Sequence, residues 1–154
     1  MNYHVARYTF TVDAPRTVDV DALLPSFRPF RCTEAEGGKL FRFTLSESPL
    51  PQAAEAVLWE TSVNDMGYTR LLKTAAGYRV ELQAIAQGLT HCMDADAAFT
   101  TLTAFIRRED PYRGEALSSL LRIAYSQAVL LHGGISVHAS SVAADGGAYM
   151  FMGR

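Results

Sequence analysis

The sequence has little cysteine and little lysine, and these absences exclude several kinds of site. Only two of its 154 residues are cysteine, Cys32 and Cys92, and they do not form a C-x-x-C pair. Neither a disulfide framework nor a zinc site is therefore indicated. His91 beside Cys92 could begin a metal site, but no second pair accompanies it, so we assign no metal ligand. This cysteine usage favours a reduced, cytoplasmic compartment.

Long apolar runs and clusters of positive charge are also missing. No stretch approaches the roughly 18 apolar residues that span a bilayer, and the first residues lack the profile of a secretory signal. Fourteen basic side chains nearly balance 16 acidic ones, giving a net charge of −2. The arginines are scattered, and the only lysines are Lys39 and Lys73. We therefore expect neither a membrane nor a nucleic acid as a partner.

The sequence does contain enough apolar residues for a packed core, at 49% of the chain, and its first two-thirds alternates with the period of strands. The Pro25 and Pro29 pair predicts an irregular, extended connection over 23–30. We interpret the aromatic residues of the alternating runs, Trp59 among them, as sheet core. Strands are expected over seven ranges: 4–12, 40–45, 56–63, 68–74, 78–86, 90–93 and 98–106, of which the last is also compatible with a helix.

The pattern changes at Asp110-Pro111, which has the form of a helix N-cap followed by proline. Apolar residues at helical spacing then predict one long amphipathic helix that ends before Gly133-Gly134, with Ser118, Arg122 and Ser126 along another face. A β-hairpin follows, with arms over 135–142 and 148–152. The predicted class is therefore α+β, with a β-rich N-terminal domain over 1–110 and a helix plus hairpin over 111–154.

The last 25 residues, 130–154, resemble the segment that precedes the Walker A loop in HPr kinase/phosphorylase-like P-loop proteins, which share the fold of the PEP carboxykinases. In that family a histidine on the first hairpin arm is followed by a glycine turn, an apolar arm and then Gly-x-Ser-Gly-x-Gly-Lys-Ser/Thr. His138, Gly146-Gly147, the apolar arm and Gly153 stand here in the same order. The rest of the chain looks like the β-rich N-terminal part of Bacteroidetes proteins with this core.

The resemblance implies that ATP and Mg²⁺ serve the full-length parent, a serine kinase or phosphorylase. It implies that His138 is catalytic, near the nucleotide phosphates, and that Gly153 and Arg154 open the phosphate-binding loop. The Walker A lysine would follow Arg154, and no lysine occurs after Lys73. We therefore expect a chain cut inside the Walker A motif, which holds no cofactor, is inactive alone and has the remainder of the kinase-like core as its partner.

Other interpretations stay open at this point. The chain could be a free-standing ligand- or protein-binding domain without nucleotide chemistry, and His138 could be a strand histidine satisfied by a hydroxyl or water. A hydrolase built on Ser136, His138 and Ser140 lacks a G-x-S-x-G elbow and an orienting carboxylate. The apolar arm 148–152 is expected to be buried against the sheet or to form a homo-oligomer.

Overall fold

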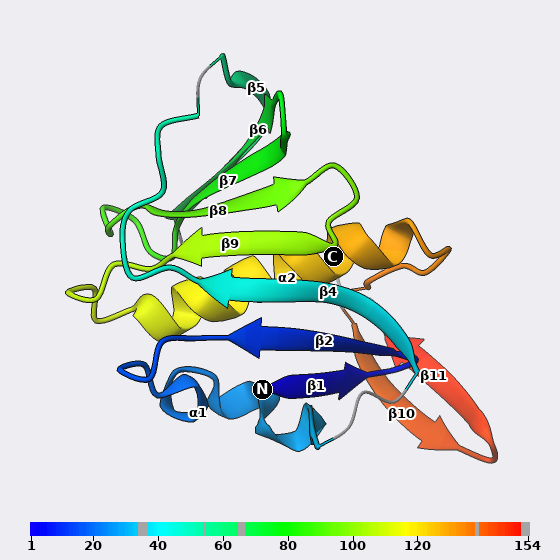
Figure 1. The fold of residues 1–154 in the computed structure, drawn as a ribbon. Coiled ribbons are helices and arrows are strands. Elements are labelled where there is room, and N and C mark those ends of the chain that lie inside the picture. Colours follow the sequence, from blue (N-terminus) through cyan, green and yellow to red (C-terminus); the bar gives the residue numbers. More distant parts are fainter. Residues whose placement is uncertain (34–36, 54, 65–66, 138, 152–154) are drawn as a thin grey trace.

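The chain folds around one large mixed sheet, seen here in a computed structural model that describes residues 1–33, 37–53, 55–64, 67–137 and 139–151. The strands of the sheet follow the order β3-β1-β2-β4-β9-β8-β7-β6-β5 (Figure 1). Their bounds are β1 Asn2–Val5, β2 Tyr8–Asp13, β3 Arg31–Cys32, β4 Gly38–Leu45, β5 Val57–Asn64, β6 Gly67–Thr74, β7 Gly77–Gln83, β8 His91–Asp96 and β9 Thr101–Phe105.

Three helices and a separate hairpin complete the described part of the chain. They are α1 Val20–Leu23, the 3₁₀ helix η1 Pro25–Phe30, α2 Arg113–Leu130, β10 Ser140–Ala144 and β11 Gly147–Phe151. Helix α2 lies behind β4 and β9 in Figure 1, and the hairpin projects beyond the end of β1 and β2. Strands β2, β4 and β9 are neighbours in parallel, whereas all the other pairs are antiparallel.

The hydrophobic core lies between the sheet and α2. Residues from β4, β8 and β9 alternate as the period of a strand requires, so that Phe43, Met93 and Leu102 are all fully buried. Leu117, Leu120, Leu121 and Ala124 of α2 meet them at helical spacing and are equally buried. One apolar cluster therefore joins residues on both sides of Asp110.

The predicted α+β class is wrong, because the fold is mostly β. Strands account for 44% of the structure and helices for 20%, and α2 is the only described helix of seven or more residues. Its 18 residues lie where the spacing predicts a helix, but α2 is one cover on a sheet of nine strands. The sheet buries its apolar face largely against this single helix. Helix is therefore a minor part of the fold.

Three local expectations also differ from the structure. The run 4–12 is not one strand, because it turns at Ala6, whose φ is +54°, and pairs with itself as β1 and β2. The connection over 23–30 is not extended, since η1 occupies most of it with Pro25 at its first turn. Trp59 lies on the edge strand β5 with 62% of its surface exposed, so it is not part of the sheet core.

Candidate functional site: an apolar cavity beside the exposed hairpin

The predicted site residues His138, Gly153 and Arg154 all lie outside the described residues. Their assignment therefore stays a prediction. The segments around them are described, namely 136–137 on one side of His138 and the hairpin β10–β11 on the other.

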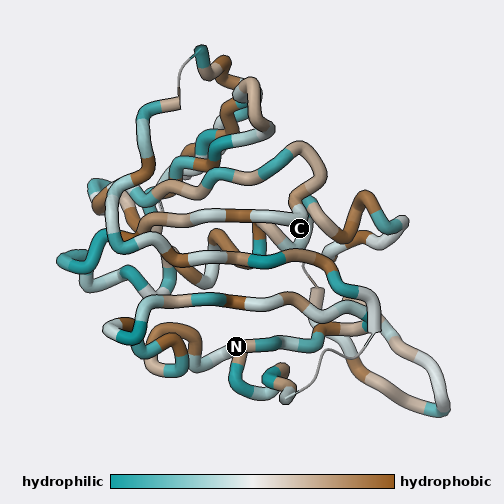
Figure 2. The backbone as a smooth tube through the Cα atoms, viewed as in Figure 1, coloured by the Kyte–Doolittle hydropathy of each residue, from teal (hydrophilic) through white to brown (hydrophobic). Residues whose placement is uncertain are grey.

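The hairpin β10–β11 is apolar and uncovered. Its strands pair from Ser140 opposite Phe151 to Ala144 opposite Gly147, and Asp145 and Gly146 both have positive φ, as a type I′ turn requires. Every strand residue is exposed, including Tyr149 at 58% and Phe151 at 62%. Within the described part of the chain, β10 and β11 pair only with each other. Figure 2 shows the ribbon standing apart from the sheet, with its hydrophilic tip farthest away.

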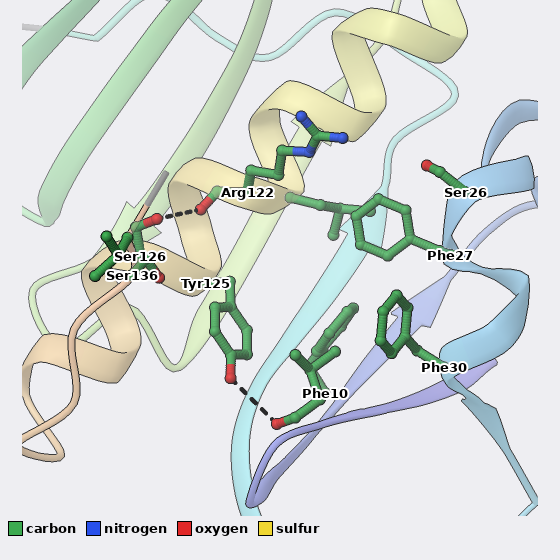
Figure 3. Close-up of a pocket in the computed structure, with 11 residues that line it drawn as sticks. Phe10, Ser26, Phe27, Phe30, Arg122, Tyr125, Ser126 and Ser136 are labelled. Carbon is green, nitrogen blue, oxygen red and sulfur yellow. Dashed lines mark hydrogen bonds between the residues drawn. The ribbon is translucent and has the colours of Figure 1, made fainter. Parts of the chain in front are cut away.

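A cavity of about 430 Å³ lies at the base of this hairpin segment, between η1, α2 and the β1–β2 pair. Its walls are aromatic. In Figure 3, Phe27 and Phe30 from η1 face Tyr125 of α2, and Phe10 of β2 lies between them. The Phe10 ring stands edge-on to Phe27 and to Tyr125, with centroids 6.4 and 6.2 Å away.

Four polar side chains line the same cavity: Ser26, Arg122, Ser126 and Ser136. The Tyr125 hydroxyl donates to the Val5 carbonyl at 3.1 Å, and burial raises the pKa of this phenol, as does the nearby Tyr8, so it remains a donor. The Ser126 hydroxyl donates to the Arg122 carbonyl at 2.8 Å. The Arg122 guanidinium makes no hydrogen bond or ion pair with any residue in the described ranges, and its side chain is exposed.

The sequence placed Arg122 and Ser126 on one helix face, but it did not indicate the aromatic wall. Pro25 and Pro29 suggested extended chain, whereas the segment forms η1, in which residues three apart lie one above the other. The spacing of Phe27 and Phe30 is the signal that could have identified this wall, because it suits a 3₁₀ turn.

A second cluster of titratable groups is buried and structural. The His91 Nε2 atom lies 2.9 Å from Asp110 Oδ2, its Nδ1 accepts the Arg107 backbone N–H at 3.2 Å, and Asp110 Oδ1 accepts the Tyr112 N–H at 2.8 Å. His91 is fully buried and Asp110 is 2% exposed. The pair therefore joins the start of β8 to the approach to α2, and no substrate can reach it.

Two forces act in opposite directions on the Asp110 carboxyl. Burial raises its pKa, but hydrogen bonds from the Tyr112 N–H, from His91 and from the Leu89 N–H together outweigh burial, and the pKa is lowered overall. Asp110 is therefore held as a carboxylate, which lets its oxygens accept hydrogen bonds from His91 and from the Tyr112 and Leu89 N–H groups. The sequence marked Asp110 as a helix N-cap. In the structure α2 begins at Arg113, and Asp110 serves the turn before it.

The described residues contain neither a candidate metal site nor a helix that could span a membrane. No group of three or more His, Cys, Asp or Glu residues that could hold a metal ion occurs among the described residues. No helix in the same ranges has the length and apolar character needed to cross a membrane. Comparison with known protein families, with curated proteins and with solved structures found no match.

Proposed function

We propose that this chain is the non-catalytic N-terminal portion of an HPr kinase-like, ATP-dependent phosphotransferase, and that the hairpin β10–β11 docks it onto a nucleotide-binding core. The observation that carries the proposal is the exposure of an apolar hairpin in which every strand residue faces solvent. An isolated two-stranded hairpin is marginal in water, so this one needs a covering partner. In the family that residues 130–154 resemble, the matching hairpin leads into the phosphate-binding loop.

Phosphoryl transfer requires a lysine, fixed N–H donors around the phosphates and carboxylates that hold Mg²⁺. The described residues offer no such group of acidic ligands, and no lysine follows Lys73. We therefore assign no ATP or Mg²⁺ contact to them. On this proposal the chemistry belongs to residues that follow Arg154, with His138, Gly153 and Arg154 at the junction, and the protein works in the cytoplasm.

The direct test of this assignment is the reading frame beyond codon 154. We expect it to continue with Ser/Thr-Gly-x-Gly-Lys-Ser/Thr, because Gly153 then takes the place of the first glycine of the motif. A stop codon at this point, or a different sequence in the frame, would contradict the proposal.

A second test concerns His138 in the extended protein, meaning the chain continued through the reading frame beyond codon 154. His138→Ala is expected to lower turnover far more than ATP affinity, since an imidazole near the phosphates acts on the reacting group and not on nucleotide binding. Steady-state kinetics and ATP titrations of the same variant measure the two effects. An unchanged turnover would remove His138 from the site.

The alternative is a binding domain without nucleotide chemistry, and the edge strand β5 favours it. Val57, Trp59 and Val63 are 65%, 62% and 75% exposed, and among the described strands β5 pairs only with β6. The Lys73 ammonium lies 5.2 Å from the centre of the Trp59 ring. An exposed edge of this length can accept a strand from another protein. The reading frame beyond codon 154 separates the two functions.

A further inference from the structure

We propose that the cavity between η1 and α2 is a binding site for a small aromatic carboxylate, with its ring among the aromatic walls and its carboxylate on Arg122. The inference concerns a ligand of the described residues themselves and does not rest on the proposed kinase-like function. A volume of about 430 Å³ lies within the range of small-molecule pockets.

The aromatic walls of the cavity favour a ligand that carries an aromatic ring. Phe10 is 1% exposed and fixed in a stack with Phe41, at a centroid distance of 4.8 Å, so the floor of the cavity is rigid. Phe30 is 44% exposed at the opening, where its ring has apolar surface available for a partner. Rings prefer edge-on or offset contacts, and the Phe10, Phe27 and Tyr125 rings already meet at steep angles that a further ring can join.

Arg122 favours a ligand with a negative charge. Asp21 holds Arg31 through its carboxylate and Arg28 through its backbone carbonyl, and Asp94 holds Arg79. Arg122 is among the residues that line the cavity, and its exposed guanidinium has no such partner in the described ranges. A guanidinium presents paired N–H donors that match the two oxygens of a carboxylate. Ser26 and Ser136 add hydroxyls that can donate to the same anion or to the substituents of the ring, whereas the Ser126 hydroxyl already donates to the Arg122 carbonyl.

The experiment is a calorimetric titration of the chain with 4-phenylbutyrate, beside the neutral 4-phenylbutanol and the cationic 4-phenylbutylamine. We expect the carboxylate to bind best and the amine worst. Arg122→Gln should weaken 4-phenylbutyrate about fivefold and leave 4-phenylbutanol unchanged, because it removes an exposed charge-assisted hydrogen bond. The control Arg16→Gln, an exposed arginine outside the cavity, should change neither titration.

Phe30→Ala tests the wall independently of the charge. Because Phe30 is 44% exposed, its loss should leave the fold intact, which circular dichroism checks, and should weaken the carboxylate and the alcohol alike. Equal binding of all three probes, an unchanged affinity in Arg122→Gln, or no heat with the carboxylate up to millimolar concentrations would overturn the proposal. If scattering shows a dimer that Phe30→Ala dissociates, a second copy of the chain occupies the cavity and the proposal is equally overturned.

Discussion

Asp110 shows how one side chain can hold an irregular segment between a strand and a helix. Its two oxygens serve different partners, His91 of β8 and the Tyr112 N–H before α2. The sequence indicated the capping character of Asp110, because Asp-Pro is a helix-start signal. It could not indicate the His91 partner, since the two residues are 19 positions apart and meet only when β8 lies beside the approach to α2.

We expect Asp110→Ala to destabilise the protein by about 2 kcal/mol, because it leaves the buried His91 N–H and the Tyr112 and Leu89 backbone N–H groups without this acceptor. Urea unfolding followed by tryptophan fluorescence and circular dichroism measures the change. Glu109→Gln is the matched control, since the Glu109 side chain is 65% exposed and its ion pair with Arg107 spans 3.9 Å. The control should stay within about 0.5 kcal/mol of the parent. A loss in Asp110→Ala no larger than that of the control would show that the pair is dispensable.

The lowered pKa of Asp110 also predicts a pH dependence. A carboxyl whose pKa is lower in the folded than in the unfolded state contributes stability above its ordinary value, here 3.8, and loses it as the pH falls toward the folded value. The difference in unfolding free energy between the parent and Asp110→Asn should therefore have its full value about one pH unit above 3.8 and shrink as the pH falls through 3.8. If this difference in unfolding free energy instead grew as the pH fell, the pKa of Asp110 would be raised in the folded state and not lowered.

Among the secondary-structure elements, the alternation of buried and exposed residues along β4 was predictable, whereas the ends of other elements were not. Phe41, Phe43 and Leu45 are buried and Arg42 is exposed, as the period of two indicates. The turn between β1 and β2 was missed, because Ala6 takes a positive φ that local sequence would assign to glycine or asparagine. The first hairpin arm was expected over 135–142, but the strand runs later, over Ser140–Ala144.

Helix α2 supplies the apolar cover of the sheet, so its buried positions should dominate its contribution to stability. Leu120→Ala should cost about 3 kcal/mol, because Leu120 is fully buried and its loss opens a cavity in the core. Leu130→Ala on the same helix is the matched control and should cost less than about 1 kcal/mol, since Leu130 is 52% exposed. Denaturant midpoints compare the two. Equal losses would mean that α2 does not pack as described.

The exposed hairpin should drive self-association of this chain. Tyr149 and Phe151 lie two apart on β11 and so share a face, which makes them the strongest apolar pair on the ribbon. The double variant Tyr149→Lys and Phe151→Lys should reduce the associated fraction in sedimentation velocity without changing the unfolding midpoint. Val57→Lys on β5 is the control for the other exposed apolar strand. If only Val57→Lys on β5 dissociates the assembly, the chains associate through the edge of the sheet and not through the hairpin.

At the scale of the whole molecule, the sheet order could not be derived from local patterns. The central neighbours β2, β4 and β9 are parallel and come from distant parts of the sequence, so nothing in their own residues specifies the pairing. The large sheet that they join is what makes the protein mostly β and overturns the α+β expectation. The candidate cavity shares this origin, because β1–β2, η1, α2 and residues 136–137 meet only in the folded chain.

We propose that the hairpin β10–β11 positions this chain on a nucleotide-binding core. A pair of calorimetric titrations with ATP·Mg²⁺ tests this proposal, one of this chain and one of the protein extended through the reading frame beyond codon 154. We predict no specific binding to this chain, and binding to the extended protein that is lost or weakened by Tyr149→Lys with Phe151→Lys, whereas Val57→Lys has no effect. Micromolar binding by this chain alone, or no binding by the extended protein, would contradict the proposed function.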